Sequence, residues 1–488
     1  MESTNNTNDN NNNDDDAQMQ MDVIPGEEEH EPAYIDPENT IEVDDDDDDA
    51  MPMDDDDDDG KEETAEDDGI AEEETAEQRR KQSSIADMSS FKLGADDEQV
   101  HTDAVFAVST CFIAETQQLL IASGGGDDKA YVTIISNDGS KRVIHCAYNH
   151  TDSVSCTSFN VNKHNKGNVM LAVGSFDGTV QLYDLTAILA ADAATDADTA
   201  NIVQPVRQLD GPSDVEWIAW HPKGGTVVLV GSSDGTLWMW FVSNGKCLQV
   251  FVGHEGEVNA GCFTVDGKWA VSCGSDATLR VWAPKTGLSR YVFRNGSDVR
   301  FSDGAPLLCL DVGGGTDQQL AIAGAADGLA WIVHLGNKRV ITSLMHCAAG
   351  GELASVEAVG FAPAAVNANW VATGGVNGDL KIWDLTNNQC RQTCSHGEKV
   401  AITRMKWHST MPLIYTAASD GALRLWDARS GILLHKMTGH LDVVNDLDVK
   451  FGAVQSGEPD IVVAGSDDRT VRGFLVDVAK CLQAASGS

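Results

Sequence analysis

The chain has 488 residues and a formal net charge of −44, with 77 Asp and Glu against 33 Lys and Arg. Binding to nucleic acid depends on Lys and Arg that displace counterions from phosphates, so we expect no direct contact with nucleic acid. No stretch approaches 18 consecutive apolar residues, which argues against a membrane-spanning helix.

The start of the chain, MESTNNTNDNNNNDDD, lacks the basic and then apolar segments of a secretory signal. The eleven Cys residues are scattered through apolar segments, which is typical of free thiols in a reducing compartment rather than of a disulfide framework. We therefore expect a soluble cytoplasmic protein, with the nucleus as a further location.

The negative charge is concentrated at the N-terminus. Residues 1–98 hold 38 acids and 5 bases, a net charge of −33, whereas the other 390 residues hold 39 acids and 28 bases, a net charge of −11. The densest part is VDDDDDDAMPMDDDDDDG, residues 43–60. Residues 1–90 contain too few apolar side chains to offset the entropy of ordering, so we predict a disordered acidic arm that helps to attract a basic partner.

From residue 91 onward the chain repeats a turn, usually Asp-Gly, followed by a short apolar strand, as in SFDGTVQLYDL and ASDGALRLWDA. Successive copies are 42 to 57 residues apart, and periods in the forties with several short strands per copy are typical of β-propellers. We predict an all-β, eight-bladed propeller over residues 91–488. The eight turn residues of this alignment are Asp128, Asp177, Asp234, Asp276, Asp327, Asn377, Asp420 and Asp468.

These copies resemble WD repeats, because Trp-Asp stands at 383–384 and 426–427 and Gly-His at 253–254 and 439–440. The resemblance implies a hydrogen-bonded network across the strands of one blade, which has a structural role rather than a catalytic one. In the most regular copy its members are His254, Ser272, Asp276 and Trp282.

Two segments are candidates for the outer strand of the last blade. WD propellers usually take this strand from the chain before the first repeat, here residues 89–100. The C-terminal VAKCLQAASGS, however, resembles the outer strand NGKCLQVFVGH of an earlier copy. The sequence leaves both possibilities open.

No catalytic or cofactor motif stands out in the chain. Phosphate-binding, zinc-protease and nucleophile-elbow patterns are missing from the sequence. The densest group of metal-binding residue types, CRQTCSH with Cys390, Cys394 and His396, has no fourth ligand at a usual spacing. We therefore expect a monomeric binding protein, not an enzyme, with no cofactor, no metal and no small-molecule substrate.

One end of a WD propeller, called here the top face, is formed by the loops that enter the inner strands and by the repeated Asp turns. Strand alternation predicts that three positions per blade point to it. Of these twenty-four positions six are acidic and none is basic, and three more are large and apolar. The acidic residues are Asp127, Asp214, Glu216, Glu257, Glu357 and Asp467, and the apolar ones are Phe106, Phe176 and Leu308. This composition predicts a basic protein partner.

Several segments resemble the angio-associated migratory cell protein family across nearly the whole propeller, above all DVEWIAWHPKG and SSDGTLWMWFVSNGKC, with GGGDDKAYV, SVEAVGFAP and SDGALRLWDARSGILL. That family includes a fungal WD-repeat chaperone of a large-subunit ribosomal protein. The resemblance implies a non-enzymatic chaperone that binds the basic N-terminal segment of its client on the top face and delivers it to the assembling 60S subunit.

On this interpretation Asp214, Glu216, Glu257 and Glu357 hold Lys and Arg of the client, while Phe106 and Phe176 pack against its apolar residues. Two alternatives remain: a histone chaperone or chromatin adaptor, and a scaffold for a ubiquitin ligase or signalling proteins.

Overall fold

The computed structural model describes residues 90–93, 100–136, 141–146, 150–161, 169–190, 202–223, 226–294, 301, 304–314, 319–346, 353–453 and 457–486. All of them belong to one compact unit, Glu66–Ser488. The acidic arm predicted for residues 1–90 lies outside the described residues, apart from Ser90.

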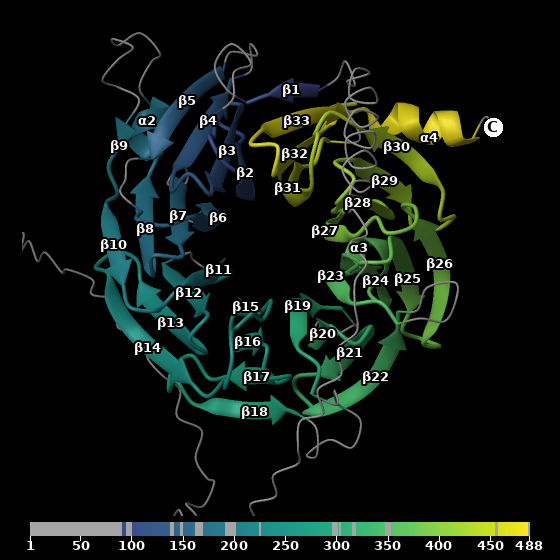
Figure 1. Ribbon diagram of the computed structural model, residues 1–488, viewed down its shortest axis with the longest axis horizontal. Helices are drawn as coiled ribbons and strands as arrows, with labels where there is room; N and C mark the ends of the chain where they lie inside the picture. The colour runs from purple at the N-terminus through teal and green to yellow at the C-terminus, as the bar shows by residue number, and fades with distance from the viewer. Residues whose placement is uncertain are drawn as a thin grey trace, which may run out of the picture. The chain divides into compact units, whose positions relative to one another are not determined.

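The described strands form eight antiparallel sheets arranged as the blades of a propeller around a central axis (Figure 1). The predicted all-β, eight-bladed fold is thus confirmed. From the inner to the outer strand, blade 1 is β2 (Val105–Ile113), β3 (Gln118–Gly125), β4 (Ala130–Ile135) and β5 (Lys141–Cys146), with β9 (Ile202–Val203) added in parallel; blade 2 is β6 (Val154–Val161), β7 (Val169–Ser175), β8 (Thr179–Asp184) and β10 (Arg207–Asp210); blade 3 is β11 (Val215–Trp220), β12 (Val227–Ser232), β13 (Thr236–Phe241) and β14 (Lys246–Val252); blade 4 is β15 (Ala260–Phe263), β16 (Ala270–Cys273), β17 (Leu279–Trp282) and β18 (Ser289–Phe293).

The second half of the ring follows the same pattern. Blade 5 is β19 (Leu307–Gly313), β20 (Leu320–Ala325), β21 (Leu329–His334) and β22 (Arg339–Met345); blade 6 is β23 (Val356–Phe361), β24 (Trp370–Gly375), β25 (Asp379–Asp384) and β26 (Gln389–Ser395); blade 7 is β27 (Ile402–Trp407), β28 (Leu413–Ala418), β29 (Leu423–Asp427) and β30 (Leu433–Met437); blade 8 is β31 (Val444–Lys450), β32 (Asp460–Ser466), β33 (Val471–Val476) and β1 (Ser90–Lys92). The described helices are α2 (Thr186–Ala190), α3 (Ala364–Asn367) and α4 (Val478–Ser486).

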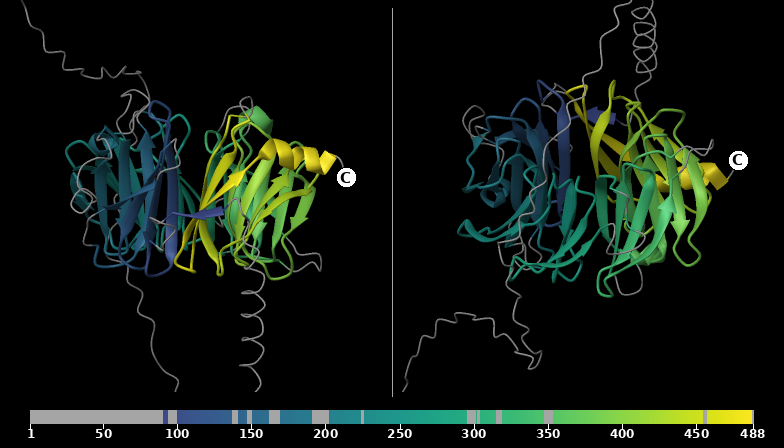
Figure 2. Two further views of the ribbon diagram at one scale, coloured as in Figure 1. Left: turned by 90° about the horizontal axis from the view of Figure 1, so that it is seen from above. Right: turned by 60° about the horizontal axis from the view of Figure 1, so that its bottom comes forward.

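Burial changes from the second strand of a blade to its outer strand. Every residue of β24 is buried, because this strand is covered by the neighbouring blades on both faces. The outer strand β22 alternates between exposed and less exposed residues, with Leu344 buried, as expected for a strand with one face toward solvent. The edge-on view at the left of Figure 2 shows the strands running between the two ends of the ring.

The N-terminal segment supplies the outer strand of the last blade. Strand β1 pairs antiparallel with β33, with Phe91 opposite Gly473. A side chain on Gly473 would overlap the Phe91 ring, since an added Cβ would lie 2.4 Å from the nearest ring carbon. Leu93, just after β1, is only 1% exposed and packs with Val463 and Val471. The first of the two closure alternatives is therefore the one adopted.

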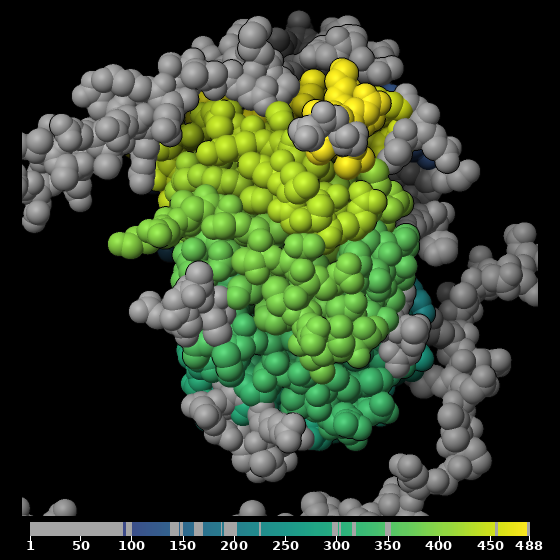
Figure 3. All heavy atoms as spheres, turned by 90° about the vertical axis from the view of Figure 1, so that its right-hand side faces the viewer, coloured from purple at the N-terminus to yellow at the C-terminus, as the bar shows by residue number. Residues whose placement is uncertain are grey.

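The competing C-terminal segment forms the helix α4 instead of a strand. The carboxylate of Asp477 caps its first turn by accepting the Lys480 N–H at 3.0 Å. Cys481 and Leu482 of the helix pack on the core shared by blades 7 and 8, and the helix contacts β30. Figure 3 shows this segment in yellow on the outer surface of the ring.

Among the described residues, no helix is both long and apolar enough to cross a membrane. The ten Cys residues that the structure describes are free thiols. Burial raises the pKa of several of them, to about 11 for Cys111 and about 12 for Cys146. These thiols stay protonated at neutral pH and have little nucleophilic character.

Candidate functional site at the top face

The inner strands share an irregularity at the top face. In seven of them the pairing shifts by one residue directly after the first residue of the strand, and in blade 4 the strand β15 begins just after the corresponding residue. A bulge leaves one residue without a ladder partner and re-aims its side chain. The eight residues at this place, called the bulge positions, are Phe106, Ser155, Glu216, Asn259, Leu308, Glu357, Thr403 and Asn445. They are the second of the three positions predicted for each blade.

Four bulge positions are used to bond neighbouring blades to each other. Each carries a short polar side chain that donates a hydrogen bond to the carbonyl oxygen of the residue that begins the next inner strand. The four bonds are Ser155 Oγ to Val215 at 2.5 Å, Asn259 Nδ2 to Leu307 at 2.7 Å, Thr403 Oγ1 to Val444 at 2.5 Å and Asn445 Nδ2 to Val105 at 3.1 Å. Adjacent inner strands share no ladder, so these bonds contribute to holding the ring together.

The other four bulge positions carry two carboxylates and two large apolar side chains. They are Phe106, Glu216, Leu308 and Glu357, and all four are partly exposed. The Phe106 ring lies against the β3–β4 turn, where an added Cβ on Gly126 would be 3.4 Å from it. Glu357 accepts the Ser355 hydroxyl at 2.5 Å. Among the described residues, acidic and apolar side chains thus occupy the four bulge positions that donate no hydrogen bond to the next inner strand.

In blades 3 and 4, the carboxylate of Glu216 lies close enough to two other predicted carboxylates to be repelled by them. Burial raises the pKa of Glu216, and the negative charges of Glu257 and Asp214 raise it further. Glu257 is exposed, whereas Asp214 and Glu216 are partly buried. Desolvation and like charges both disfavour the ionised form of Glu216, and a cationic group bound beside it would remove this penalty.

Asp127 is not part of the top surface, contrary to the sequence prediction. Its Oδ1 lies 2.9 Å from His101 Nδ1, and only 3% of its side chain is exposed. Asp127 is therefore the repeated turn aspartate of blade 1, and Asp128 follows it in the left-handed conformation at φ 61°. In the next blade Gly178 has this place, at φ 78°. The two adjacent aspartates shifted the alignment of this repeat by one residue.

The remaining predicted residues lie at the top face with different surroundings. Asp467 accepts a hydrogen bond from Asn445 Nδ2 at 2.6 Å, so part of its hydrogen-bonding capacity is already used. Phe176 is partly exposed in the β7–β8 turn, where its N–H bonds to the Ser153 carbonyl at 3.0 Å. Neither side chain belongs to the carboxylate group formed by Asp214, Glu216 and Glu257.

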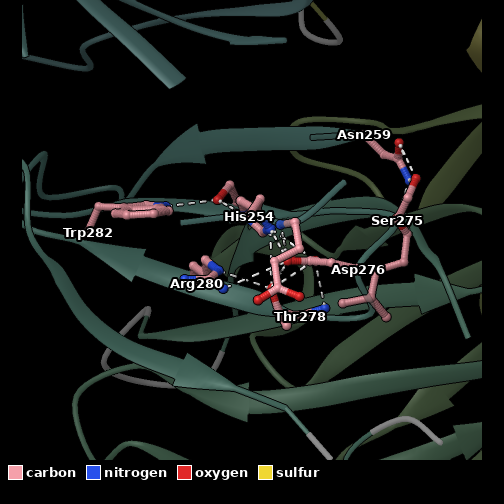
Figure 4. A network of polar contacts seen from close by, with 10 residues as sticks. His254, Asn259, Ser275, Asp276, Thr278, Arg280 and Trp282 are labelled. Carbon is pink, nitrogen blue, oxygen red and sulfur yellow. Dashed lines mark hydrogen bonds and ion pairs between the residues drawn. The ribbon is translucent and has the colours of Figure 1, made fainter. Parts of the chain in front are cut away.

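The predicted repeat network is present in blade 4 (Figure 4). His254 Nδ1 lies 3.0 Å from Asp276 Oδ1, and its Nε2 lies 2.8 Å from Ser272 Oγ. Trp282 Nε1 donates to the same hydroxyl at 2.8 Å. Burial alone would raise the pKa of Asp276, but the hydrogen bond and charge of His254 outweigh it and bring the pKa to about 2. The four side chains thus form one connected network, which agrees with a structural role.

Equivalent His–Asp contacts occur in other blades, with substitutions in some. The Nδ1 of His150 lies 3.1 Å from Asp177, and that of His440 lies 3.1 Å from Asp468. In blade 6, His346 instead contacts Asn377 and Thr373. In blade 7, Asp420 pairs with Arg424. The repeated acidic turns are therefore committed to the framework.

Sequence reasoning missed acidic residues in the loops just before the inner strands. Asp103, Asp152, Glu255 and Asp442 are exposed there, and three of them also accept the N–H of the residue that follows. Basic residues occur in the same kind of loop or turn in blades 1, 7 and 8, namely Lys129, Lys399 and Arg469. The three-position rule passed over all of these because none of them stands next to the first buried residue of an inner strand or directly before a turn aspartate. Among the described residues, they make blades 2 to 4 the more acidic part of the top face.

The residues of CRQTCSH do not converge on a common centre. Cys394 is buried and Cys390 is exposed, while His396 bonds to Thr416 Oγ1 at 2.7 Å and to the Gly378 carbonyl at 3.1 Å. Burial and the charge of Arg424 lower the pKa of His396 to about 3. Within the described ranges, no three His, Cys, Asp or Glu side chains are grouped so that they could hold a metal ion.

Comparison with known proteins agrees with this architecture. The WD domain, G-beta repeat family matches residues 141–184, 203–240, 245–283, 388–427 and 431–474. Angio-associated migratory cell proteins of Homo sapiens and Canis lupus familiaris are each 31% identical over 397 residues, which is 78% of this chain and 81% of theirs.

Among solved structures, Saccharomyces cerevisiae Sqt1 matches with a TM-score of 0.66 and 18% identity, over 80% of this chain and all of that one. Chaetomium thermophilum Sqt1 bound to the N-terminus of the ribosomal protein L10 matches with a TM-score of 0.62 and 21% identity, over 78% and 98% of the two chains. At these identities the two structures support the fold. Because the relatives share 31% of their residues over most of both chains, this chain belongs to the angio-associated migratory cell protein family of WD-repeat proteins.

Proposed function

We propose that this protein is a chaperone that binds the basic N-terminal segment of a large-subunit ribosomal protein on its top face and delivers it to the assembling 60S subunit. The solved structure of a similar propeller bound to the N-terminus of ribosomal protein L10 supports this choice of partner. Such a client is made in the cytoplasm, and we place the protein there.

The observation that carries the proposal is a group of carboxylates in blades 3 and 4 that have no cationic partner among the described residues. Burial raises the pKa of Glu216, and the negative charges of Glu257 and Asp214 raise it further. A Lys or Arg side chain placed among them would form charge-assisted hydrogen bonds and relieve that repulsion. Glu357, two blades further on, offers a second carboxylate for another cationic residue of the client.

Apolar groups lie at the same end of the ring. Phe106 and Leu308 occupy bulge positions of blades 1 and 5, and Phe176 lies in blade 2. Partly exposed aromatic side chains supply burial in protein interfaces, whereas exposed charges mainly speed association. A segment with alternating basic and apolar residues would use both kinds of contact.

Such binding also explains why an acidic protein would serve as a chaperone. A free ribosomal protein rich in Lys and Arg binds many RNAs through their phosphates. Carboxylates that occupy its basic segment compete with those phosphates. The client would be released when its specific contacts on the ribosomal precursor become more favourable than the contacts on the propeller.

The test is isothermal titration of the full chain with a synthetic N-terminal peptide of ribosomal protein L10. The double variant Glu257→Lys/Glu357→Lys is expected to lose binding, because both carboxylates become cations. The matched control is Glu115→Lys/Glu458→Lys, which changes net charge equally at the exposed loops at the far ends of β2 and β31. Binding at wild-type strength by the first variant would contradict the proposal.

Affinity purification from cells at low salt tests the identity of the partner. Recovery of one ribosomal protein supports the proposal, provided that the double variant no longer recovers it. Recovery of histones or of a ubiquitin ligase in its place would favour the alternative functions and count against the chaperone.

A further inference from the structure

A second candidate site lies at the other end of the inner strands. A cavity of about 290 Å³ opens between blades 4, 5 and 6, where β19 and β23 end. It is lined by Asp311, Val265, Phe361 and Pro363, among other residues. Ligand pockets for drug-sized molecules begin at about 300 Å³, so this cavity suits a group no larger than an amino-acid side chain.

The carboxylate in this cavity is held in a fixed orientation. Asp311 Oδ2 accepts the Phe361 N–H of the neighbouring blade at 2.7 Å, and Oδ1 accepts the Val312 N–H at 2.9 Å. Burial raises the pKa of Asp311 to about 6, although the two N–H donors lower it. No charged group in the described part of the chain contributes to this pKa.

The same construction recurs in blade 8, where it includes a cation. Asp448 is the fifth residue of β31, as Asp311 is of β19. Its Oδ2 accepts the Thr110 N–H of the next inner strand at 2.7 Å, and its Oδ1 accepts the following N–H at 2.9 Å. In addition, Lys406 of β27 forms an ion pair with Oδ1.

The blade that precedes Asp311 offers no such cation. Counting from the bulge positions, Lys406 stands three residues after Thr403, and the residue three after Asn259 is Cys262. Burial raises the pKa of this thiol, and the charge of Asp311 adds to the effect, so Cys262 stays neutral. Among the described residues, Asp311 therefore has the backbone bonds of Asp448 without its counter-ion.

The walls of the cavity suit an apolar stem. Val265 is 48% exposed at the rim, and the Phe361 ring forms part of the wall. Gly314 has a left-handed conformation at φ 61° and passes so close to this ring that an added Cβ would lie 2.2 Å from it. Long cationic side chains pack their methylene groups on apolar surfaces while their charged ends meet a polar partner.

We propose that this cavity binds one primary ammonium or guanidinium group on a short apolar stem, with the carboxylate of Asp311 as its counter-ion. The group belongs either to a Lys or Arg side chain of a bound protein or to a free alkyl diamine. An ion pair in this partly desolvated position is stronger than one on the open surface. The site is separate from the top face and does not depend on the proposed chaperone function.

The test is a titration of the full chain with N-acetyl-lysine methylamide at pH 7.5, observed through the amide signals of Val312 and Phe361. Both amides donate to Asp311 and report directly on its carboxylate. The matched probe is N-acetyl-norleucine methylamide, which has a similar stem without the charge. We expect saturable shifts with the lysine probe, about tenfold weaker binding in Asp311→Asn, and unchanged binding in Asp266→Asn, which removes a partly exposed charge next to Val265.

A second variant covers the case in which Asp311→Asn fails to fold. Val265→Trp fills the rim from an exposed position, leaves the bonds of Asp311 in place and is expected to abolish the shifts. Parallel titrations with N-acetyl-arginine methylamide and with cadaverine distinguish a protein side chain from a free diamine as the better ligand. Equal binding of the norleucine probe, wild-type affinity in Asp311→Asn, or no shift with any cationic probe would overturn the proposal.

Discussion

Asp448 of β31 accepts the backbone N–H of Thr110 of β2 at 2.7 Å, which bonds the inner strand of the last blade to that of the first. The Thr110 hydroxyl donates to the same carboxylate oxygen at 2.7 Å. At the circumference the same junction is closed by β1, which joins the start of the described chain to β33. The ring is therefore closed both near its axis and at its rim, by contacts between residues far apart in the sequence.

Closure at the rim predicts a large effect of Leu93→Ala. Leu93 is 1% exposed and packs with Val463 and Val471, so removing its side chain should lower the free energy of unfolding by about 2–5 kcal/mol. Denaturant unfolding measures this value. The control is Leu475→Ala on β33, where the side chain is 42% exposed and the expected change is within about 0.5 kcal/mol. An equal loss of unfolding free energy in the two variants would show that the packing of Leu93 does not stabilise the closed ring.

The two aspartates Asp127 and Asp214 should have opposite phenotypes. Asp127→Asn removes the charge that faces His101 and should lower the free energy of unfolding by about 1–3 kcal/mol without weakening peptide binding. Asp214→Asn should leave stability within about 0.5 kcal/mol and weaken peptide binding. Unfolding and titration of both variants give the comparison. If instead Asp127→Asn weakened peptide binding and left stability unchanged, Asp127 would belong to the binding surface and not to the framework.

The stability difference for Asp127→Asn also depends on pH. Burial tends to raise the pKa of Asp127, but the hydrogen bond and charge of His101 outweigh it, and the net pKa is lowered. A lowered pKa in the folded state stabilises the protein above the unfolded value, near pH 4, and this contribution is lost as the pH falls through the folded value. Wild type and variant should therefore converge in stability in acid.

Glu216→Gln should make the protein more stable and a weaker binder. Because its pKa is raised in the folded state, the folded protein holds the proton more tightly than the unfolded chain, and stability falls as the pH rises from the unfolded to the folded value. The amide introduced by Glu216→Gln carries no charge, so the variant does not lose this stability as the pH rises. We expect a gain in Tm at pH 7.5 that disappears in acid, together with reduced affinity for the basic peptide. A loss of Tm at pH 7.5 would contradict the inferred repulsion.

Deletion of residues 1–88 should change the rate of association with the client more than the rate of dissociation. The deleted segment includes the two runs of six Asp, while β1 is retained. Removing this charge should slow association by about tenfold at low salt, and the effect should shrink as salt screens the charges over about 8 Å at physiological strength. Surface plasmon resonance at several salt concentrations separates the two rates. A many-fold faster dissociation would instead place the acidic segment within the binding site.

Much of the framework could be predicted from the sequence, because its features are local. The number of blades follows from the spacing of the turns, and the contacts of His254, Ser272, Asp276 and Trp282 follow from their positions within one repeat. These properties depend on residues that are close in the sequence or repeat at a regular interval.

The register of blade 1 could have been found with a stricter local rule. Counting back from the following strand, Asp127 stands three residues before β4, just as Asp468 stands three before β33. The presence of two adjacent aspartates obscured this relation, since either could serve as the turn residue. The left-handed φ of Asp128 shows that a non-Gly residue has taken the usual place of Gly.

The sequence by itself determined a repeating all-β chain with eight turns and an acidic N-terminal segment. Only the tertiary structure decided that β1 rather than the C-terminal segment closes the ring, and that four of the bulge positions bond the blades while four are partly exposed. It also decided that Asp311 has no cation among the described residues where Asp448 has Lys406. The reason is physical. Each of these outcomes depends on contacts between segments that are far apart in the sequence, and such contacts form only when the ring is complete.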